Sequence, residues 1–188
     1  MPTADMLTAK ISHGFESLDV DGDGRLTEHD HVLMGRRVAA SLGHPSGSDA
    51  EGQIIDAFLR IWRDLHLPHI PGGGTAITKE QFVVSTRSLA ADPAAARATV
   101  GALAEAFLDI ADTDADGTVG PDEFLVFQRG HFPGVSESDA AEAFRHLDTD
   151  GDGLLSSTEF VQAIIEFWSS TDPDAPGNWW MGRPTYLP

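Results

Sequence analysis

The chain has 188 residues, a formal net charge of −18 and no cysteine. The acidity argues against nucleic acid and anionic membranes as partners, and the lack of cysteine excludes disulfides and thiolate metal sites. No run approaches the roughly eighteen apolar residues of a membrane span, and the first residues lack the regions of a secretory signal, so we expect a cytoplasmic protein.

The first predicted helix spans residues 3–18, and an acidic loop of twelve residues at 19–30 leads into a second helix over 28–42. The predicted ligands of this loop are Asp19, Asp21 and Asp23 at positions 1, 3 and 5, the backbone carbonyl of Arg25 at position 7, and Asp30 at position 12. Oxygen atoms at this spacing wrap a hard divalent cation, and Gly24 allows the sharp left-handed turn at position 6. The loop therefore has the pattern of an EF-hand.

Position 12 of this loop departs from the usual pattern. Asp30 is one methylene shorter than the glutamate expected there, so it binds an ion through both oxygens only if the loop contracts. Magnesium is smaller than calcium and demands octahedral geometry. We therefore expect magnesium to be favoured over calcium at 19–30.

The next two helices flank a loop without ligands. Apolar residues at helical spacing predict a helix over 48–65, and Thr78 with Gln81 forms a capping box at the start of the following helix. Residues 66–76 between them contain no carboxylate, so we expect no ion there. Ile77 retains the apolar position through which paired loops join by a short strand, and this unit is predicted to act as a scaffold for the first loop.

Two further loops match the full pattern, between helices predicted at 94–111 and 121–129 and at 136–147 and 156–169. The ligands predicted for the third loop (112–123) are Asp112, Asp114, Asp116, the carbonyl of Thr118, and Glu123, and those for the fourth loop (148–159) are Asp148, Asp150, Asp152, the carbonyl of Leu154, and Glu159. Both loops end in a glutamate long enough to bind calcium through two oxygens. The sequence thus predicts three calcium ions, with magnesium possible in the first loop.

These units divide the chain into three parts. Residues 1–91 form a pair of EF-hands in which the second is degenerate, residues 92–170 form a pair with two functional loops, and residues 171–188 form an aromatic, proline-rich tail. We expect an all-α fold of four EF-hand helix-loop-helix units in two paired lobes that share one compact body. We also expect a monomer.

The tail contains two of the four tryptophans, whereas disordered tails are poor in aromatic residues. We therefore predict that it packs on the body, with Trp62 and Trp168 as candidate neighbours. The side chains expected to pack are those of Trp179, Trp180, Met181, Tyr186 and Leu187. A free tail and an external interaction motif are the alternatives.

The hand pattern with a degenerate second loop, together with a tail beginning Asp172-Pro-Asp-Ala-Pro-Gly-Asn-Trp, resembles the sarcoplasmic calcium-binding protein family, including its bacterial calerythrin-like members. The resemblance covers essentially the whole chain. It implies a compact all-helical protein that buffers calcium and magnesium, with the first, third and fourth loops filled.

Other functions fit the sequence less well. No nucleophile elbow, phosphate loop or dinucleotide fingerprint is present, and His66 and His69 lie in a proline-containing loop, so neither an enzyme nor a zinc site is expected. A calcium sensor with a protein target is an alternative, although four methionines provide little of an adaptable groove. A photoprotein-like luciferin-binding protein is a weaker alternative, because Tyr186 is the one tyrosine available to such a cavity.

Overall fold

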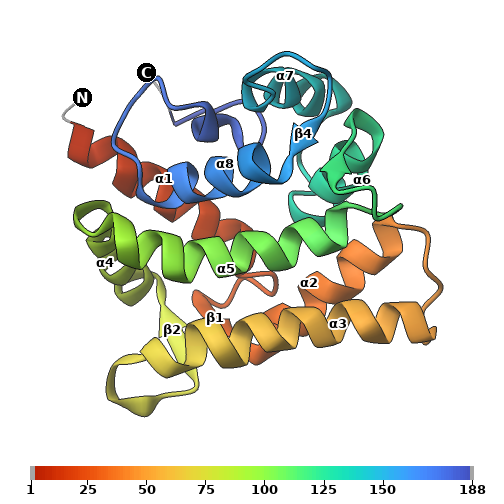
Figure 1. Ribbon diagram of the computed structural model, residues 1–188. Coiled ribbons are helices and arrows are strands. Elements are labelled where there is room, and N and C mark those ends of the chain that lie inside the picture. The colour runs from red at the N-terminus through yellow and green to blue at the C-terminus, as the bar shows by residue number, and fades with distance from the viewer. Residues whose placement is uncertain (1–2, 187–188) are drawn as a thin grey trace.

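The structure is a computed structural model that describes residues 3–186, apart from the side chains at positions 3–5, 65, 69 and 71. Within that part of the chain, eight α-helices form four helix–loop–helix units (Figure 1). The helices are α1 (Thr3–Leu18), α2 (Glu28–Ser41), α3 (Asp49–Ile61), α4 (Lys79–Ser88), α5 (Pro93–Ala111), α6 (Pro121–His131), α7 (Glu137–Leu147) and α8 (Ser157–Ser169). The predicted all-α class is confirmed. The expected packing of Leu187 lies outside the described residues.

Two short antiparallel strand pairs join the loops two by two. The pairs are β1 (Arg25–Thr27) with β2 (Ala76–Thr78), and β3 (Thr118–Val119) with β4 (Leu155–Ser156). In the first pair Leu26 lies opposite Ile77, as the sequence predicts. In the second pair Val119 lies opposite Leu155, and all four of these side chains are buried. Each of the three predicted ion-binding loops is therefore joined to its neighbouring loop by a buried apolar contact between the two strands.

Side-chain caps set the starts of several helices at the predicted residues. The capping box of Thr78 with Gln81 opens α4, and that of Ser156 with Glu159 opens α8. Because Glu159 is also the last residue of the fourth loop, the start of α8 and the closure of that loop depend on the same carboxylate.

The third helix is shorter than the sequence predicts. Regular α3 ends at Ile61, and a π-helix continues over Trp62–His66 instead of the expected helix to residue 65. This wider turn stacks the rings of Trp62 and His66 with their centroids 6.2 Å apart, and both rings contact His31 of α2. The packing of these three rings accounts for the change in helix type.

The two halves of the chain meet through α2, α3 and α6. The ring of Phe58 on α3 lies 5.4 Å from that of His131 on α6, centroid to centroid. Arg37 of α2 donates hydrogen bonds to the carbonyl oxygens of Gly130 and His131 at 2.6 and 2.7 Å. These bonds satisfy carbonyl groups at the end of α6 that have no partner within the helix.

The tail packs on the body of the molecule, as expected, mainly on the second half of the chain and also on α1, where the ring of Tyr186 lies 5.6 Å from that of His13. Three aromatic rings contact Trp180, those of Phe124, Phe127 and Phe160, at centroid distances of 6.2, 5.8 and 5.0 Å. Trp179 stacks on His146 of α7 at 3.8 Å. Of the two expected neighbours, Trp168 lines the same cavity as Trp180, whereas Trp62 contacts His31. The short connection from α8 leads the tail over α7 and α8.

Lys10 of α1 fastens the tail to the end of α8. Its ammonium group donates to the carbonyl oxygens of Glu166 and Ser170 and to Oδ1 of Asn178, at 3.1, 2.8 and 2.8 Å. The side chain is fully buried, and burial lowers the pKa of Lys10 to about 8 despite the opposing attraction of Glu166 and Asp172. The positive charge lies at the negative end of the α8 dipole, where it is stabilised.

A glycine lets the tail backbone approach α8 closely. The N–H of Gly177 donates to a carboxylate oxygen of Glu166 at 2.8 Å, and a Cβ at this position would lie 2.3 Å from the carbonyl oxygen of Ala163. The buried side chains of Asn178, Trp180 and Met181 follow directly. The tail is therefore an integral part of the packed body.

Across the described residues, no helix combines the length and apolar character needed to cross a membrane.

Candidate metal centres

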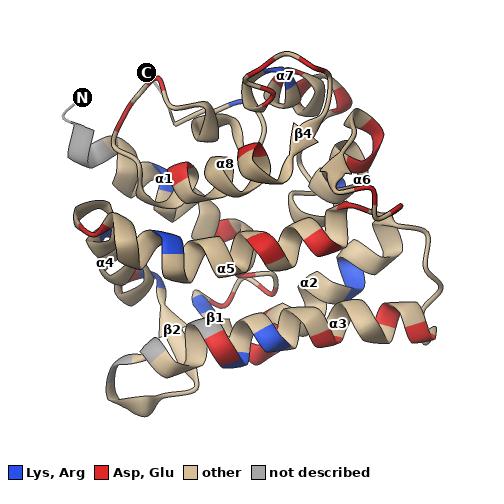
Figure 2. Cartoon of the chain, viewed as in Figure 1, with Lys and Arg blue, Asp and Glu red and all other residues tan. Residues whose placement is uncertain are grey.

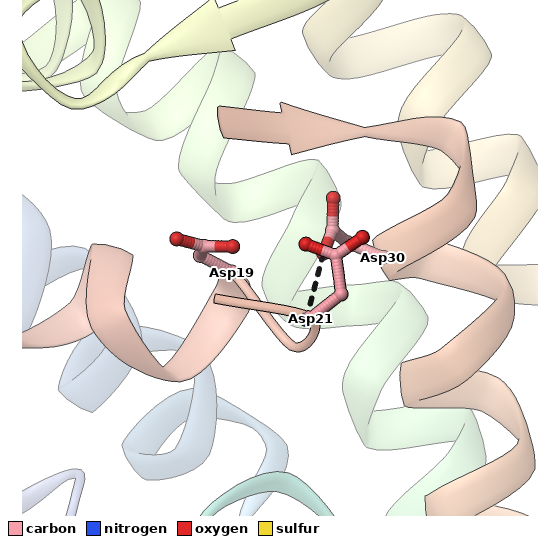
Figure 3. Close-up of side chains that lie close together, drawn as sticks. All are labelled: Asp19, Asp21 and Asp30. Atoms are coloured by element: carbon pink, nitrogen blue, oxygen red, sulfur yellow. Dashed lines mark hydrogen bonds between the residues drawn. The ribbon is translucent and has the colours of Figure 1, made fainter. Parts of the chain in front are cut away.

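Three clusters of carboxylates stand out among the described residues, one in each loop that the sequence singles out. Each cluster joins positions 1, 3 and 12 of its loop, with one oxygen from each residue within 4.8 Å of the other two. The clusters are Asp19, Asp21 and Asp30; Asp112, Asp114 and Glu123; and Asp148, Asp150 and Glu159. Figure 3 shows Asp30 reaching from the start of α2 toward the turn that carries Asp19 and Asp21. Acidic residues mark these loops in Figure 2.

The first aspartate of each loop fixes the turn. One oxygen of Asp19 accepts the N–H of Gly24 at 2.8 Å, and the same bond joins Asp112 to Gly117 at 2.9 Å and Asp148 to Gly153 at 3.0 Å. The glycines at position 6 have φ values of 82°, 89° and 89°, a left-handed conformation that costs little without a Cβ. The three loops therefore share one turn geometry.

The residues at position 5 lie outside the clusters. Each of these aspartates accepts the N–H of the residue two positions on, at 2.8, 2.8 and 2.9 Å for Asp23, Asp116 and Asp152. The residues whose backbone carbonyls are predicted ligands at position 7, Arg25, Thr118 and Leu154, are the donors of these bonds. The structure thus brings together positions 1, 3 and 12 and orders positions 5 and 7 against one another.

The glutamates at position 12 hold both ends of their loops. Glu123 accepts the N–H groups of Thr113 and Gly120 at 2.8 and 2.9 Å, and Glu159 accepts those of Thr149 and Ser156 at 2.8 and 3.0 Å. Burial raises the pKa of both, but the hydrogen bonds outweigh burial, leaving the pKa of Glu123 lowered and that of Glu159 at about 2. Both are anionic at neutral pH and hence competent to bind a cation.

Asp30 takes the same place in the first loop despite its shorter side chain. Its two oxygens accept the N–H groups of Val20 and Thr27 at 2.9 and 2.8 Å, the two loop positions that the glutamates hold elsewhere. Asp30 is fully buried, whereas Glu123 and Glu159 are partly exposed. Asp30 therefore joins both ends of the first loop as the glutamates do in theirs, and it does so from a buried position.

Position 4 distinguishes the third loop from the other two. The first and fourth loops have glycines there, with φ values of 74° and 73° for Gly22 and Gly151, but the third has Ala115 at φ 60°. Among the described residues, Ala115 is the one non-glycine with a positive φ. A left-handed conformation costs an alanine about 1 kcal/mol, so this loop is slightly strained.

The second loop differs from the other three. Its described residues form no carboxylate cluster, and the segment contains two short 3₁₀-helices, Leu67–His69 and Pro71–Gly73. The His69 side chain, half of the zinc pattern weighed above, is outside the described part of the chain. What this unit contributes is its strand, through Ile77.

Sequence reasoning missed a cavity of about 450 Å³ in the body of the molecule. Its walls are largely aromatic and aliphatic, and it reaches the surface beside the exposed Ser85 and Ser88 of α4. Buried His131 lines it, with Nδ1 3.3 Å from the carbonyl oxygen of Phe127 and with no hydrogen-bond partner for Nε2. Burial lowers the pKa of His131 to about 3, so the ring is neutral. Scattered histidines in the sequence gave no signal of this site.

Because a carbonyl oxygen only accepts, Nδ1 of His131 carries the proton and Nε2 presents a lone pair. Gln128, one turn before His131, has a second buried acceptor without a partner, its Oε1. The Nε2 of the same amide donates to the carbonyl of Trp180 at 2.7 Å. Of these two acceptors, Nε2 of His131 belongs to a residue that lines the cavity, where a donor from a ligand or from water could pair with it.

Two models of known families match the second half of the chain. The model described as EF hand covers residues 103–128, and the model described as EF hand domain covers residues 139–167. The matched residues contain the third and fourth loops with parts of their helices.

Full-length relatives point the same way. Calerythrin from Saccharopolyspora erythraea is 28% identical over 167 residues, covering 88% of this chain and 93% of its own. Mitrocomin from Mitrocoma cellularia is 37% identical over 178 residues, covering 90% and 85%. The crystal structure of a coelenterazine-binding protein from Renilla muelleri, in its calcium-loaded apo form, is similar with a TM-score of 0.76 and 26% identity, covering 97% and 98%.

Proposed function

The chain belongs to the EF-hand family of calcium-binding proteins, and from this premise we propose that it is a monomeric cytoplasmic buffer that holds three divalent ions. The ions occupy the loops at 19–30, 112–123 and 148–159. One observation carries the proposal. In each of these three loops, carboxylate oxygens from positions 1, 3 and 12 lie together, whereas the second unit has no such cluster within its described residues.

The donor sets suit hard cations. Calcium takes six to eight oxygen ligands, mainly carboxylates, backbone carbonyls and water. We propose that the ligands are the predicted set, in which positions 1, 3, 5 and 12 give carboxylates and position 7 gives a backbone carbonyl. At position 5, Oδ1 of each aspartate accepts the backbone hydrogen bond from position 7, and Oδ2 is the oxygen proposed to bind the ion. The residue at position 12 also accepts N–H groups from positions 2 and 9 and so joins the two ends of the loop.

The first loop is proposed to prefer magnesium. Asp30 is already in contact with both ends of its loop, and its burial leaves little room for the wider coordination that calcium takes. The third and fourth loops, with longer and partly exposed glutamates, are proposed to take calcium.

The packing of the tail supports a buffer over a sensor. A sensor opens an apolar groove for its target, and an empty groove of this kind exposes a large patch to water. Here Trp180 and Met181 are buried on the helices of the second half, and Lys10 fastens the segment between them and α8. The tail occupies the surface that a target helix would otherwise fill.

Titration calorimetry tests the stoichiometry. We expect three sites for the wild type and a loss of calcium affinity of at least roughly tenfold at one site in Glu123→Gln, which removes an anionic bidentate ligand. Asp122→Asn is the matched control, because it removes the same charge from the neighbouring exposed residue. Four sites, or an equal effect of both variants, contradict the ligand assignment.

A dye that fluoresces on apolar surfaces separates buffer from sensor. For a buffer whose tail covers the apolar surface of the second half, adding calcium at millimolar magnesium lowers dye binding or leaves it unchanged. A rise in dye binding on calcium addition contradicts the buffer and favours the sensor.

The cavity favours a second candidate function, binding of a small aromatic ligand of the luciferin type. The coelenterazine-binding relative shares the fold over nearly the whole chain, and here the unpaired Nε2 of His131 is suited to a hydroxyl or N–H donor. Titration with coelenterazine, followed by tryptophan quenching, tests this. Saturable quenching that is lost in His131→Phe but kept in the exposed His29→Phe supports it, and linear quenching in all three proteins contradicts it.

A further inference from the structure

A second hollow on the molecule is unlike the first, because it is an open groove with an acidic rim. Its volume is about 1070 Å³, and α3 and α5 line its two long sides, with the third loop at one end. Its apolar floor is formed by Leu42, Ile54, Ile61, Ala106, Ile110 and Val126. Most of these side chains are partly exposed, so the floor is covered by no other part of the described chain.

The charges around this groove are mostly negative. Asp64 of the π-helix that follows α3, Asp109 of α5 and Asp122 of α6 are exposed at its edge, and Asp112 and Glu123 close the end at the third loop. Arg60 is the one guanidinium in its lining. Figure 2 shows acidic positions along both α3 and α5. An apolar floor between acidic edges is complementary to an amphipathic helix with a basic face.

The dimensions suit such a helix. The lining residues on this side run from Gln53 of α3 to Asp64 of the π-helix that follows it, which corresponds to roughly 16 Å of helix at 1.5 Å per residue. A partner segment of three to four turns therefore fills it.

Three other occupants fit less well. The tail is seated on α7 and α8, neither of which lines the groove. A second copy of the chain would bring another formal charge of −18 to an acidic edge, and an anionic lipid surface is repelled for the same reason. A cationic segment of another protein is the occupant that both the floor and the rim favour.

We propose that the groove between α3 and α5 binds a basic amphipathic helix of a protein partner, and that ion binding to the third loop weakens this binding. The second half of the proposal rests on the proposed function. Asp112 and Glu123 belong to both the loop and the groove, so a divalent ion there adds two positive charges beside the partner's basic face. By linkage, the partner lowers the ion affinity of the loop by the same factor.

The first test uses the full chain in a chelator and a labelled synthetic peptide of leucine and lysine, about four turns long, followed by anisotropy. The double variant Asp64→Lys/Asp109→Lys is expected to lower the affinity roughly tenfold, because it reverses two rim charges. The control is Asp56→Lys/Glu105→Lys, which makes the same change in charge at exposed residues of α3 and α5 outside the groove. We expect less than about a twofold effect from it.

Absence of peptide binding in the chelator overturns the proposal, and so does an equal loss in both double variants, which would indicate an unspecific attraction to an acidic protein. A peptide with glutamate in place of lysine is expected not to bind.

The second test repeats the titration in saturating calcium. The affinity is expected to fall at least roughly threefold in the wild type and to change less in Glu123→Gln. Tighter binding in calcium overturns the coupling. If calorimetry finds no ion at 112–123, the proposed function fails there, while peptide binding in the chelator is judged on its own.

Discussion

The two halves of the chain each pair two loops through short strands, but the loops differ in their ligands. In the first half, a loop that ends in the short, fully buried Asp30 is paired with a loop that has no ligands. In the second half, two loops that end in partly exposed glutamates are paired with each other, and the tail is packed on their helices. The strand pairing is the same in both, so a hand without ligands still serves its neighbour as a support.

The comparison also shows how the last residue of each loop holds the loop backbone. Asp30, Glu123 and Glu159 each accept N–H groups from the second and ninth positions of their loops. Since these bonds are the same for a short and a long side chain, the loop adjusts to the residue. The proposed preference of the first loop for magnesium rests on this difference of one methylene group at position 12.

The largest difference between the halves is the tail, and its removal is expected to have the largest effect on stability. Ending the chain after Ser170 exposes the surface that buries Trp180 and Met181, at about 1.5–3 kcal/mol for each side chain. We expect a loss of about 5 kcal/mol in the free energy of unfolding in urea, measured with calcium present. Trp180→Ala is the milder variant, expected to cost about 3 kcal/mol. An unchanged urea midpoint for the truncated chain would show that the tail is dispensable.

The protein is expected to lose stability in acid because His131 is buried at the contact between the halves. Burial lowers the pKa of His131 to about 3, from an ordinary value near 6.5, so the unfolded chain binds a proton that the folded chain excludes. Stability is then full above pH 6.5 and falls as the pH drops toward 3, by about 3 kcal/mol at pH 4.

Urea unfolding of the ion-free protein from pH 7 to pH 4 measures this effect. His131→Leu flattens the profile, whereas His29→Leu, at an exposed histidine, leaves its slope unchanged. His31, whose pKa burial lowers to about 4, contributes a second, smaller slope of the same sign. A wild-type profile that is flat over this range would rule out buried, neutral histidines.

Exchanging the last residue of the first loop tests whether position 12 sets the ion preference. Asp30→Glu makes this loop end like the third and fourth, and we expect its ratio of calcium to magnesium affinity to rise roughly tenfold. Competition calorimetry measures the ratio, with the exposed Glu28→Asp as the control that alters length at a residue outside the cluster. An unchanged ratio would mean that position 12 does not set the preference.

The smallest expected effect concerns the strained alanine of the third loop. Ala115→Gly gives this loop the residue found at position 4 of the other two, and we expect a gain of about 0.5–1 kcal/mol in the ion-free protein, after allowing for the extra freedom of glycine when unfolded. Thermal unfolding measures it. The exposed Ala102→Gly on α5 is expected to do the opposite, because its backbone is helical.

Local patterns predicted most of the fold because they depend on neighbours in sequence. The helix starts at Thr78 and Ser156, the turn glycines and the Leu26–Ile77 pairing follow from short motifs. The tail was expected to pack, but its neighbours depend on tertiary geometry that no local pattern contains. For the same reason the burial of Lys10 and His131 was not foreseen, since both gain their surroundings from distant segments.

The most direct test follows ion binding to each loop separately, through the NMR signal of the amide of its sixth residue. Gly24, Gly117 and Gly153 donate to the first aspartates of their loops, so ion binding to those carboxylates shifts their amide resonances in an ¹⁵N-labelled sample. We predict that magnesium shifts Gly24 first, that calcium then shifts Gly117 and Gly153 together, and that Gly72 and Gly73 in the degenerate loop do not move. A Gly24 resonance that responds to neither ion, or three resonances that respond alike to magnesium, would contradict the account.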